Sequence, residues 1–436
     1  MQIQNPKHGY KLSKFLFQKF EEIPYEWGIV KLIELCDEKP QYGAAVSALP
    51  EAKPLPRYIR ITDIRDDGTL NDDVVSISEE DARPFLLSKG DFLFARTGAT
   101  VGKTYIYRDK DGHSAFAGYL IRFKPNEQKL NAEFLFHYCH SANYWRWLRS
   151  FFTHWVQPNV NAEQYSNLLI ITPTFKEQHK IASILSKVDD FIQKTDKIIE
   201  QTQRLKKGLM KRLLTKGIGH TKFKVHEFGM LALEVPENWS VRAFNEIVAS
   251  YKNGIYKLPE YYGKGFVSIR MFNIVNGKID PTGAPLLDVS QEELSDYALK
   301  IGDILVNRVN TAELVGKAGL VDRDLGAITF ESKNIRIRVK DNCSPEFLAY
   351  FMNSILYYRQ IRTNIKRAIG QSTLNQSDLN NIFVPLPPIE EQKEIVSILN
   401  KVDAAIELAM RYRTETIGLK KGLMQQLLTG KFRVKV

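Results

Sequence analysis

The chain has 436 residues, of which 44% are hydrophobic, and a formal net charge of +11. This length allows about three domain-sized units with packed cores, and the basic balance permits an anionic partner such as nucleic acid or a membrane surface. Three cysteines that lie far apart argue against a disulfide framework or a structural zinc site, and the lack of an apolar run approaching ~18 residues predicts no membrane span.

The first folded unit opens at Ile23-Pro24-Tyr25-Glu26-Trp27, after a start that has no signal-peptide core, so we expect a cytoplasmic protein. Short apolar runs bounded by Gly, Asp and Asn follow, for example residues 59–64 and 90–96, and they predict strands and turns. Residues 131–149 have a helical pattern. We therefore predict a mixed α and β (α+β) first domain over residues 1–173.

One long helix is predicted next, over residues 174–216. Thr174 and Glu177 form a capping box just after Pro173. Apolar residues then recur in a heptad stripe widened by a third position, which is typical of a helix buried on one side. About 40 helical residues would span roughly 60 Å.

The second half of the sequence repeats the first at an offset of 210 to 214 residues. Val235-Pro236-Glu237-Asn238-Trp239 matches the opening of the first unit, and the Lys-Lys-Gly-Leu-Met of residues 206–210 returns at residues 420–424. We therefore expect a second domain over residues 217–386, with a helix at 345–362, and a second long helix over residues 387–430. Two unrelated amphipathic helices would not explain the shared polar residues.

The two long helices are expected to pack against each other. Glycine inside a helix costs about 1 kcal/mol relative to alanine, so its presence at both Gly208 and Gly422 predicts that the helices approach closely there. The predicted helix–helix residues are Ile181, Ile184, Val188, Phe191, Ile198, Leu205, Leu209, Ile395, Ile398, Val402, Tyr412, Leu419 and Leu423.

The stretches between the matching pieces differ strongly, as residues 41–57 and 252–266 illustrate. Loops on a fixed frame are where recognition usually resides, although neutral drift also favours changes in loops. The contrast favours a recognition role in which one scaffold carries two different sets of loops.

Three motifs suggest chemistry, and each is incomplete. Residues 98–104 resemble a phosphate-binding loop but have three residues between the glycines, where the motif needs four. His137, Cys139 and His140 could suggest a metal, yet no further ligand follows at a suitable spacing, so we predict a partly buried helix face and no metal site. Glu51 and Lys53 match the acid-x-Lys form of some nucleases without a paired acid. The sequence favours binding without chemistry of its own.

The repeated pattern resembles the specificity subunit of type I restriction–modification systems, and the resemblance covers nearly the whole chain. It depends on residues 90–98 followed by Val101-Gly102-Lys103, and on Ile170-Ile171-Thr172-Pro173 leading into Glu177-Gln178 and the long helix. Residues 384–392 form the corresponding Pro-rich segment before the second long helix. In the second copy Arg308-Val309-Asn310 replaces Arg96-Thr97-Gly98.

The resemblance implies two target recognition domains separated by an antiparallel coiled-coil spacer, with a pseudo-two-fold internal repeat. It implies a chain without catalysis that binds double-stranded DNA and recruits two methyltransferase subunits and the restriction subunits. No cofactor is expected in this chain, while S-adenosylmethionine, ATP and magnesium are expected in those partners. Each domain would face the major groove of one half-site, with centres near 35 Å apart. Because the loops differ, the target should be asymmetric.

Polar side chains in the variable loops are the favoured DNA contacts. The predicted DNA-binding residues are Tyr42, Arg57, Arg60, Arg96, Lys103, Tyr256, Lys257, Arg270, Arg308, Asn310 and Lys317. Arg60 and Arg270 recur in both copies, so they could instead be structural salt-bridge partners. Two other functions stay open: a nuclease or NTPase acting on DNA, and a coiled-coil scaffold that binds only protein.

Overall fold

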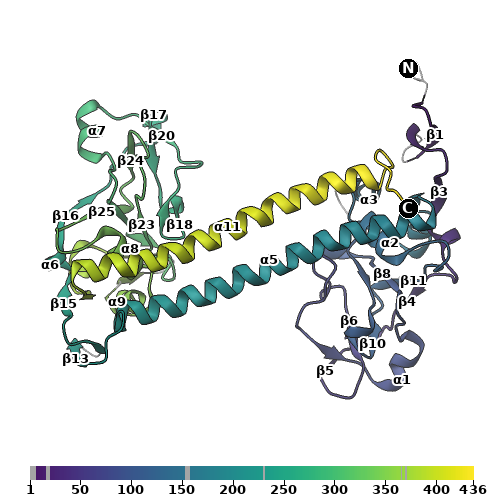
Figure 1. Ribbon diagram of the computed structural model, residues 1–436, viewed down its shortest axis with the longest axis horizontal. Coiled ribbons are helices and arrows are strands. Elements are labelled where there is room, and N and C mark those ends of the chain that lie inside the picture. The colour runs from purple at the N-terminus through teal and green to yellow at the C-terminus, as the bar shows by residue number, and fades with distance from the viewer. Residues whose placement is uncertain (1–5, 16–19, 153–157, 229–230, 365, 369–370) are drawn as a thin grey trace. The chain divides into compact units, whose positions relative to one another are not determined.

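The computed structural model describes residues 6–15, 20–152, 158–228, 231–364, 366–368 and 371–436. The chain divides into two compact units. Unit 1 comprises Met1–Asp196 and Arg411–Val436, and unit 2 comprises Lys197–Met410. Each unit therefore contains one globular part and a section of both long helices (Figure 1).

The globular part of unit 1 contains two four-stranded sheets. The first is antiparallel throughout and has the order β4 (Gln41–Tyr42), β11 (Leu120–Phe123), β8 (Phe92–Ala95) and β9 (Thr104–Ile106). The second has the order β10 (Ser114–Phe116), β6 (Arg57–Ile59), β7 (Val75–Ser76) and β5 (Leu49–Pro50), and its β10–β6 pair is parallel. Two antiparallel pairs accompany them: β1 (Tyr10–Lys14) with β2 (Phe20–Pro24), and β3 (Gly28–Lys31) with β12 (Leu169–Thr172).

Unit 2 has a related arrangement with different sheet sizes. Its main sheet has the order β16 (Val248–Asn253), β25 (Asn334–Val339), β21 (Ile304–Asn307), β23 (Ala318–Leu320), β19 (Lys278–Ile279) and β18 (Ile274–Val275). A second sheet contains β20 (Leu286–Leu287), β17 (Tyr262–Ile269) and β24 (Ile328–Phe330), and its β17–β24 pair is again parallel. The remaining strands are β13 (Phe223–Phe228) with β14 (Leu231–Pro236), β15 (Ser240–Ala243) with β28 (Phe383–Leu386), and β22 (Val309–Asn310) with β27 (Gln371–Thr373) and β26 (Lys366–Ala368). The predicted duplication of a mixed α and β domain is confirmed.

Each predicted helix of the globular parts is divided into two by a new N-cap. Residues 131–149 form α2 (Ala132–Cys139) and α3 (Ala142–Arg149), and residues 345–362 lie within α8 (Pro345–Met352) and α9 (Ile355–Asn364). Ser141 Oγ accepts a hydrogen bond from Tyr144 N at 3.3 Å, which satisfies a donor at the start of α3. The short helices are α1 (Glu79–Ala82), α4 (Ala162–Ser166), α6 (Phe244–Ile247), α7 (Gln291–Tyr297) and α10 (Gln376–Asn380).

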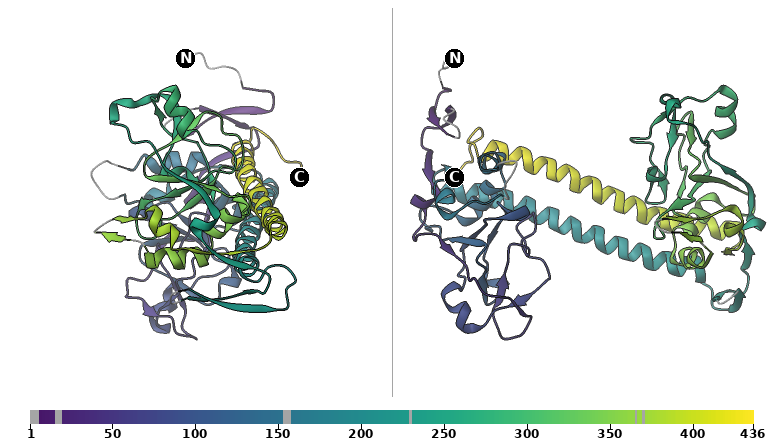
Figure 2. Two further views of the ribbon diagram at one scale, coloured as in Figure 1. Left: turned by 90° about the vertical axis from the view of Figure 1, so that its left-hand side faces the viewer. Right: turned by 180° about the vertical axis from the view of Figure 1, so that it is seen from behind.

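The two long helices are α5 (Phe175–Lys216) and α11 (Ile389–Leu427), and they lie side by side in each unit (Figures 1 and 2). In unit 1, Asp189 pairs with Lys420 at 2.5 Å and Asp196 pairs with Arg413. A step forward along α5 therefore matches a step backward along α11, so the helices are antiparallel. No helix in the described ranges is long and apolar enough to cross a membrane.

The start of α5 carries the predicted capping box, because Glu177 N donates to Thr174 Oγ1 at 3.4 Å and Thr174 N donates to Glu177 Oε2 at 3.3 Å. Trp27 Nε1 also donates to Glu177, at 2.9 Å, and Arg433 Nε donates at 2.6 Å. Burial alone would raise the pKa of Glu177, but these hydrogen bonds lower it. Trp239 and Glu391 repeat the contact in unit 2, at 2.9 Å.

The long helices contribute directly to the globular cores. Ile181, Leu185 and Leu427 are buried in one cluster with Trp27 and Phe134 of unit 1. Met210, Leu213, Ile395 and Leu399 are buried with Trp239 and other apolar side chains of unit 2. Since burying one large aliphatic side chain contributes roughly 1.5–3 kcal/mol, each globular part is bound firmly to its section of the helix pair.

One contact between domain and helices is equivalent in the two units. In unit 1, buried His137 lies with its Nδ1 3.7 Å from Asp189, the carboxylate that holds Lys420 of α11. In unit 2, Tyr350 donates to Asp403 at 2.8 Å, and Asp403 pairs with Lys206 of α5 at 2.5 Å. The repeat relates Asp189 to Asp403 and Lys206 to Lys420, so the two ion pairs are reciprocal.

The structure corrects two predictions about the helix pair. Five of the predicted helix–helix side chains are exposed by 51–58%, and they are Phe191, Ile198, Leu205, Tyr412 and Leu419. Two helices bury only one stripe of each other, and the row containing these residues lies outside that stripe. Gly208 and Gly422 are also exposed, with no atom within 4 Å of an added Cβ, so close helix approach does not explain them.

Candidate nucleic-acid interface

Arg96 follows β8 at one end of the first sheet of unit 1. Its backbone N donates to Tyr119 O at 3.1 Å, and its backbone O accepts from Val160 N at 2.8 Å. The guanidinium lies 4.9 Å from the centre of the Tyr42 ring, a cation–π distance. Among the described residues no carboxylate forms an ion pair with it, so its charge is available to an anionic ligand.

Arg308 follows β21 at the corresponding place in unit 2. Its backbone N donates to Lys333 O at 2.8 Å, and its backbone O accepts from Leu374 N at 2.9 Å. This guanidinium likewise forms no ion pair with a described residue. Neighbouring Asn310 donates through Nδ2 to Asn307 Oδ1 at 2.9 Å. The side-chain Oδ1 of Asn310 accepts a hydrogen bond from Thr311 N, also at 2.9 Å.

The Nε atoms of Arg96 and Arg308 are buried and lack a hydrogen-bond partner among the described residues. Leaving a buried donor unsatisfied costs about 1–3 kcal/mol. Guanidinium donors match the acceptors of phosphate groups and of guanine. A ligand that offers such acceptors could pair with the guanidinium in both units, although Arg57 and Arg270 also have a buried Nε without a described partner.

The other cationic candidates of unit 1 already have protein partners. Arg60 pairs with Asp63 and Asp73, each at 2.8 Å, and the hydrogen bond that Arg60 donates to Asp63 raises the pKa of Arg60. Lys103 pairs with Asp66 at 2.8 Å. Arg57 donates to Asn71 O at 2.8 Å. The two ion pairs of Arg60 therefore agree with the alternative that it is a structural salt-bridge partner.

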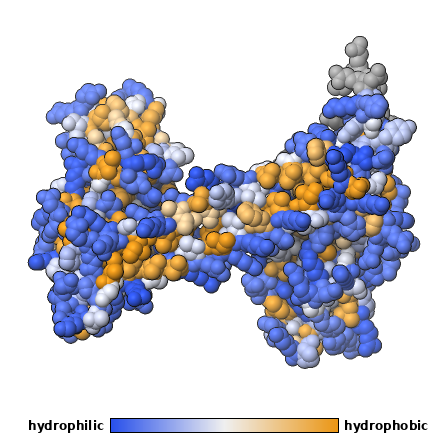
Figure 3. Space-filling model, in the orientation of Figure 1, coloured by the Kyte–Doolittle hydropathy of each residue, from blue (hydrophilic) through white to orange (hydrophobic). Residues whose placement is uncertain are grey.

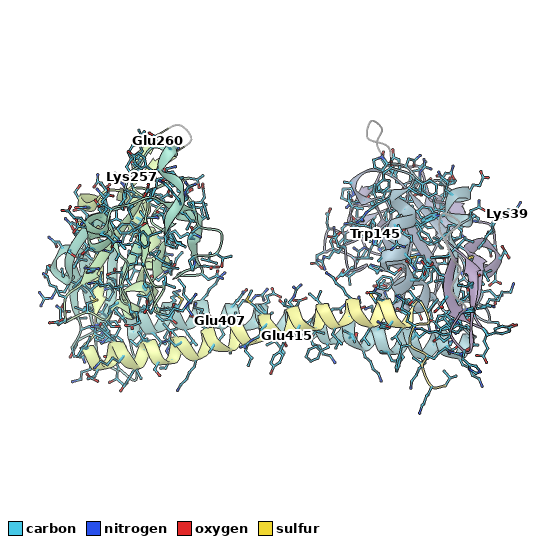
Figure 4. The ribbon with its side chains drawn as sticks, turned by 90° about the horizontal axis from the view of Figure 1, so that it is seen from above. Lys39, Trp145, Lys257, Glu260, Glu407 and Glu415 are labelled. Carbon is cyan, nitrogen blue, oxygen red and sulfur yellow. The ribbon has the colours of Figure 1, made fainter. Side chains whose placement is uncertain are left out.

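In unit 2, two of the other cationic candidates also lie close to a carboxylate of the protein. Lys257 pairs with Glu293 at 2.6 Å, and Arg270 lies 3.5 Å from Glu331. Tyr256, beside Lys257, is 76% exposed. Figure 4 shows Lys257 and Glu260 at the end of unit 2 away from the long helices. Burial lowers the pKa of Lys317, which forms no ion pair with a described residue.

The turn that resembles a phosphate-binding loop has a packing explanation. Gly102 has a φ of +87°, and an added Cβ would lie 2.1 Å from Leu148 of α3. Tyr144 Oη donates to Gly102 O at 2.9 Å, and Tyr357 Oη donates to Gly316 O at 3.0 Å in unit 2. The glycine shared by the two copies thus allows this turn to pack against the helix that carries the tyrosine.

The residues weighed as metal ligands contact other parts of the fold. His137 Nε2 lies 3.0 Å from Ser186 Oγ of α5, and His140 Nδ1 lies 2.8 Å from Phe136 O. Burial raises the pKa of Cys139 well above its usual value. Across the described ranges, no group of three or more His, Cys, Asp or Glu side chains is arranged to hold a metal ion.

Three exposed side chains near the arginines were missed by the sequence reasoning. Tyr119, Asn253 and Lys333 belong to no motif and lie at strand ends. Their common signal is position: Tyr119 and Lys333 directly precede β11 and β25, and Asn253 ends β16. Aligning the two copies strand by strand, instead of by short identical stretches, would have identified them.

Comparison with known proteins agrees with the duplicated frame. The family model of the type I restriction modification DNA specificity domain matches residues 24–204 and again residues 236–416. The chain is similar to the MjaVIII specificity subunit of Methanocaldococcus jannaschii, with 28% identity over 433 residues that cover 98% of this chain and 97% of that protein. Similarity to the EcoKI specificity subunit of Escherichia coli K12 is 27% over 192 residues, covering 44% of this chain and 41% of that protein.

Two solved structures share the fold. A chain from a type I R-M system, solved in work on its complex assembly and conformational transition, has a TM-score of 0.56 and 17% identity, with 94% of this chain and 100% of that chain covered. An S subunit from M. genitalium has a TM-score of 0.56 and 14% identity, with 94% and 97% covered. Because the two family matches span most of the sequence, this chain belongs to the family of type I restriction modification DNA specificity domains and carries the domain twice.

Proposed function

We propose that this chain is the DNA specificity subunit of a type I restriction–modification complex and that it reads a bipartite, asymmetric double-stranded target. The observation that carries the proposal is the pair Arg96 and Arg308, two arginines without a described ion-pair partner at the same point of a duplicated frame. The side chains around them differ, so each unit would read a different half-site. Its DNA substrate would place its action in the cytoplasm.

The partner subunits would carry out the catalytic reactions. Methyltransferase subunits would use S-adenosylmethionine, and restriction subunits would use ATP and magnesium, while this chain would supply recognition alone. The apolar row left exposed on the long helices supports a site for the methyltransferase subunits. Hydrophobic residues show along these helices in Figure 3, and Ile198, Leu205 and Leu419 are each more than half exposed.

We expect the double variant Leu205→Glu with Leu419→Glu to lose the methyltransferase subunits, because two charges would replace apolar contacts. Both side chains are exposed, so the thermal unfolding temperature should change little. Co-purification with tagged methyltransferase subunits measures the loss. Gln203→Glu, an exposed change on the same helix, is the matched control and should retain the partners. Full retention by the double variant would place the partner site elsewhere.

The function itself is tested by comparing methylated adenines in a host genome with and without the gene for this chain. One bipartite sequence should lose methylation when the gene is absent. The purified complex should also retain duplex DNA of that sequence in preference to a scrambled duplex. A chain that binds its partners without sequence-specific retention of DNA would be a protein scaffold, and turnover by the purified chain alone would make it an enzyme.

A further inference from the structure

The two arginines are flanked by side chains whose positions correspond strand by strand. Tyr119 O and Lys333 O accept the hydrogen bonds from the backbone N atoms of Arg96 and Arg308. Tyr119 directly precedes β11, and Lys333 directly precedes β25. These two positions are therefore equivalent in the repeat, although one holds a phenol ring and the other an ammonium group.

A second pair of positions corresponds through the edge strands. Tyr42 of β4 pairs with Ile121, and Asn253 of β16 pairs with Ile335. A glycine follows each of them and fixes the register, because an added Cβ would lie 2.3 Å from Phe116 O at Gly43 and 2.1 Å from Glu331 O at Gly254. Tyr42 and Asn253 are thus the second pair of flanking positions.

All four flanking side chains are exposed. Tyr119 is 59% exposed and Tyr42 is 38% exposed. The structure records no hydrogen bond from the side chains of Tyr119, Asn253 or Lys333 to a described residue, whereas Tyr42 Oη accepts one from Ala162 N at 3.0 Å. The frame thus holds one constant group, the arginine, beside two groups that differ between the copies.

We propose that Arg96 and Arg308 bind a DNA backbone phosphate in each half-site, and that the flanking positions, Tyr42 with Tyr119 and Asn253 with Lys333, determine which bases each half-site contains. This inference rests on the proposed function. A phosphate is present in every half-site, so a constant arginine suits it. A base that differs between half-sites requires side chains that differ.

The flanking side chains have the donors and acceptors that base recognition needs. Asparagine can form two hydrogen bonds with adenine N6 and N7, and lysine can donate to guanine O6 and N7. Tyrosine offers a ring for apolar contact and one hydroxyl that donates or accepts. The half-site read by unit 2 is therefore expected to present adenine or guanine edges, and the half-site read by unit 1 a different pattern.

The test exchanges the flanking positions between the units in the complete methyltransferase complex. Tyr42→Asn with Tyr119→Lys places the side chains of unit 2 in unit 1, and Asn253→Tyr with Lys333→Tyr does the reverse. Mapping of methylated adenines should show that each double variant changes one half-site and keeps the other. Tyr25→Asn, at a 71% exposed tyrosine of unit 1, is the control and should keep both half-sites.

A third variant tests the arginine. Arg96→Ala should weaken binding to all sequences alike, with unchanged half-sites and a log–log salt slope reduced by about 1. Reduced sequence specificity at a single base pair in this variant would overturn the assignment of Arg96 to a phosphate. Folded exchange variants that keep both wild-type half-sites would overturn the role of the flanking positions. The Tyr119→Lys change alone, at a side chain without a recorded hydrogen bond, separates that result from misfolding.

If the wild-type complex methylates no specific bipartite sequence, the proposed function fails. If the wild-type complex has such a target and the exchange variants share it, only the inference fails.

Discussion

Asp63 and Asn273 occupy the same place in the two copies, and the difference changes the neighbouring arginine. Each side chain accepts a hydrogen bond from the backbone N of the arginine three residues earlier, at 2.9 Å from Arg60 and 3.0 Å from Arg270. Asp63 also pairs with the Arg60 guanidinium, whereas neutral Asn273 cannot, and Arg270 lies near Glu331 instead. Single substitutions within a fixed turn thus decide which charges remain available to a ligand.

His137 should make the stability of unit 1 sensitive to acid. Burial, with the nearby Lys420 charge, lowers the pKa of His137 from 6.5 to about 3. Below about pH 6.5 the unfolded chain therefore binds a proton that the folded unit does not, and stability falls as the pH falls from 6.5 towards 3. We expect His137→Gln to lose less thermal stability than the wild type between about pH 7 and 5.

Thermal unfolding measured across that range checks this expectation. His140 also has a pKa lowered by burial, so part of the acid sensitivity should remain in the variant. Tyr350→Phe is the control, because the equivalent tyrosine of unit 2 has a raised pKa and does not titrate there. A His137→Gln curve that follows the wild type at every pH would refute the assignment.

The exposed glycines of the long helices predict a gain in stability. Gly208→Ala and Gly422→Ala should each stabilise the protein by about 1 kcal/mol, because alanine favours helix and nothing lies within 4 Å of the new Cβ. Denaturant or thermal unfolding measures the change. Gly102→Ala is the opposite control, since its φ is +87° and its Cβ would lie 2.1 Å from Leu148. Destabilisation by the helix variants would contradict the reasoning.

The long helices also show where sequence reasoning succeeds and where it ends. Periodicity, the capping box at Thr174 and the internal repeat predicted both elements and their pairing. The same periodicity could not tell which of three adjacent rows faces the partner helix, because Ile198 and Ile199 are equally apolar. Only the structure shows Ile198 as 54% exposed and Ile199 as partly buried.

The candidate interface was predictable to a smaller extent. Arg96 and Arg308 were predicted because arginine suits a contact with DNA and because each ends a stretch that the two copies share. Lys103 and Lys257 look equally suitable in sequence, but their ion pairs with Asp66 and Glu293 depend on loops that only the fold brings together. Tyr119 and Lys333 share no motif and were not singled out, and the backbone hydrogen bonds to Arg96 and Arg308 show their equivalence in the structure.

The proposed function predicts that helix length sets the spacing of the half-sites. One heptad inserted between Asp196 and Lys206 of α5, and one between Asp403 and Arg413 of α11, would lengthen both helices by about 10 Å. The ion pairs on either side would stay in register. We expect the number of unread base pairs to change, or specific binding to be lost, as measured by mapping methylated adenines. Unchanged spacing would count against this dependence.

The reciprocal ion pairs bear on how such a chain could arise. One copy of the repeat contains both Asp189 and Lys206, and the other contains both Asp403 and Lys420. A half-length ancestor would already have carried acid and base at matching places on a single helix. Two identical molecules of it could therefore have formed both bridges as a homodimer, before gene duplication and fusion allowed the two recognition surfaces to evolve separately.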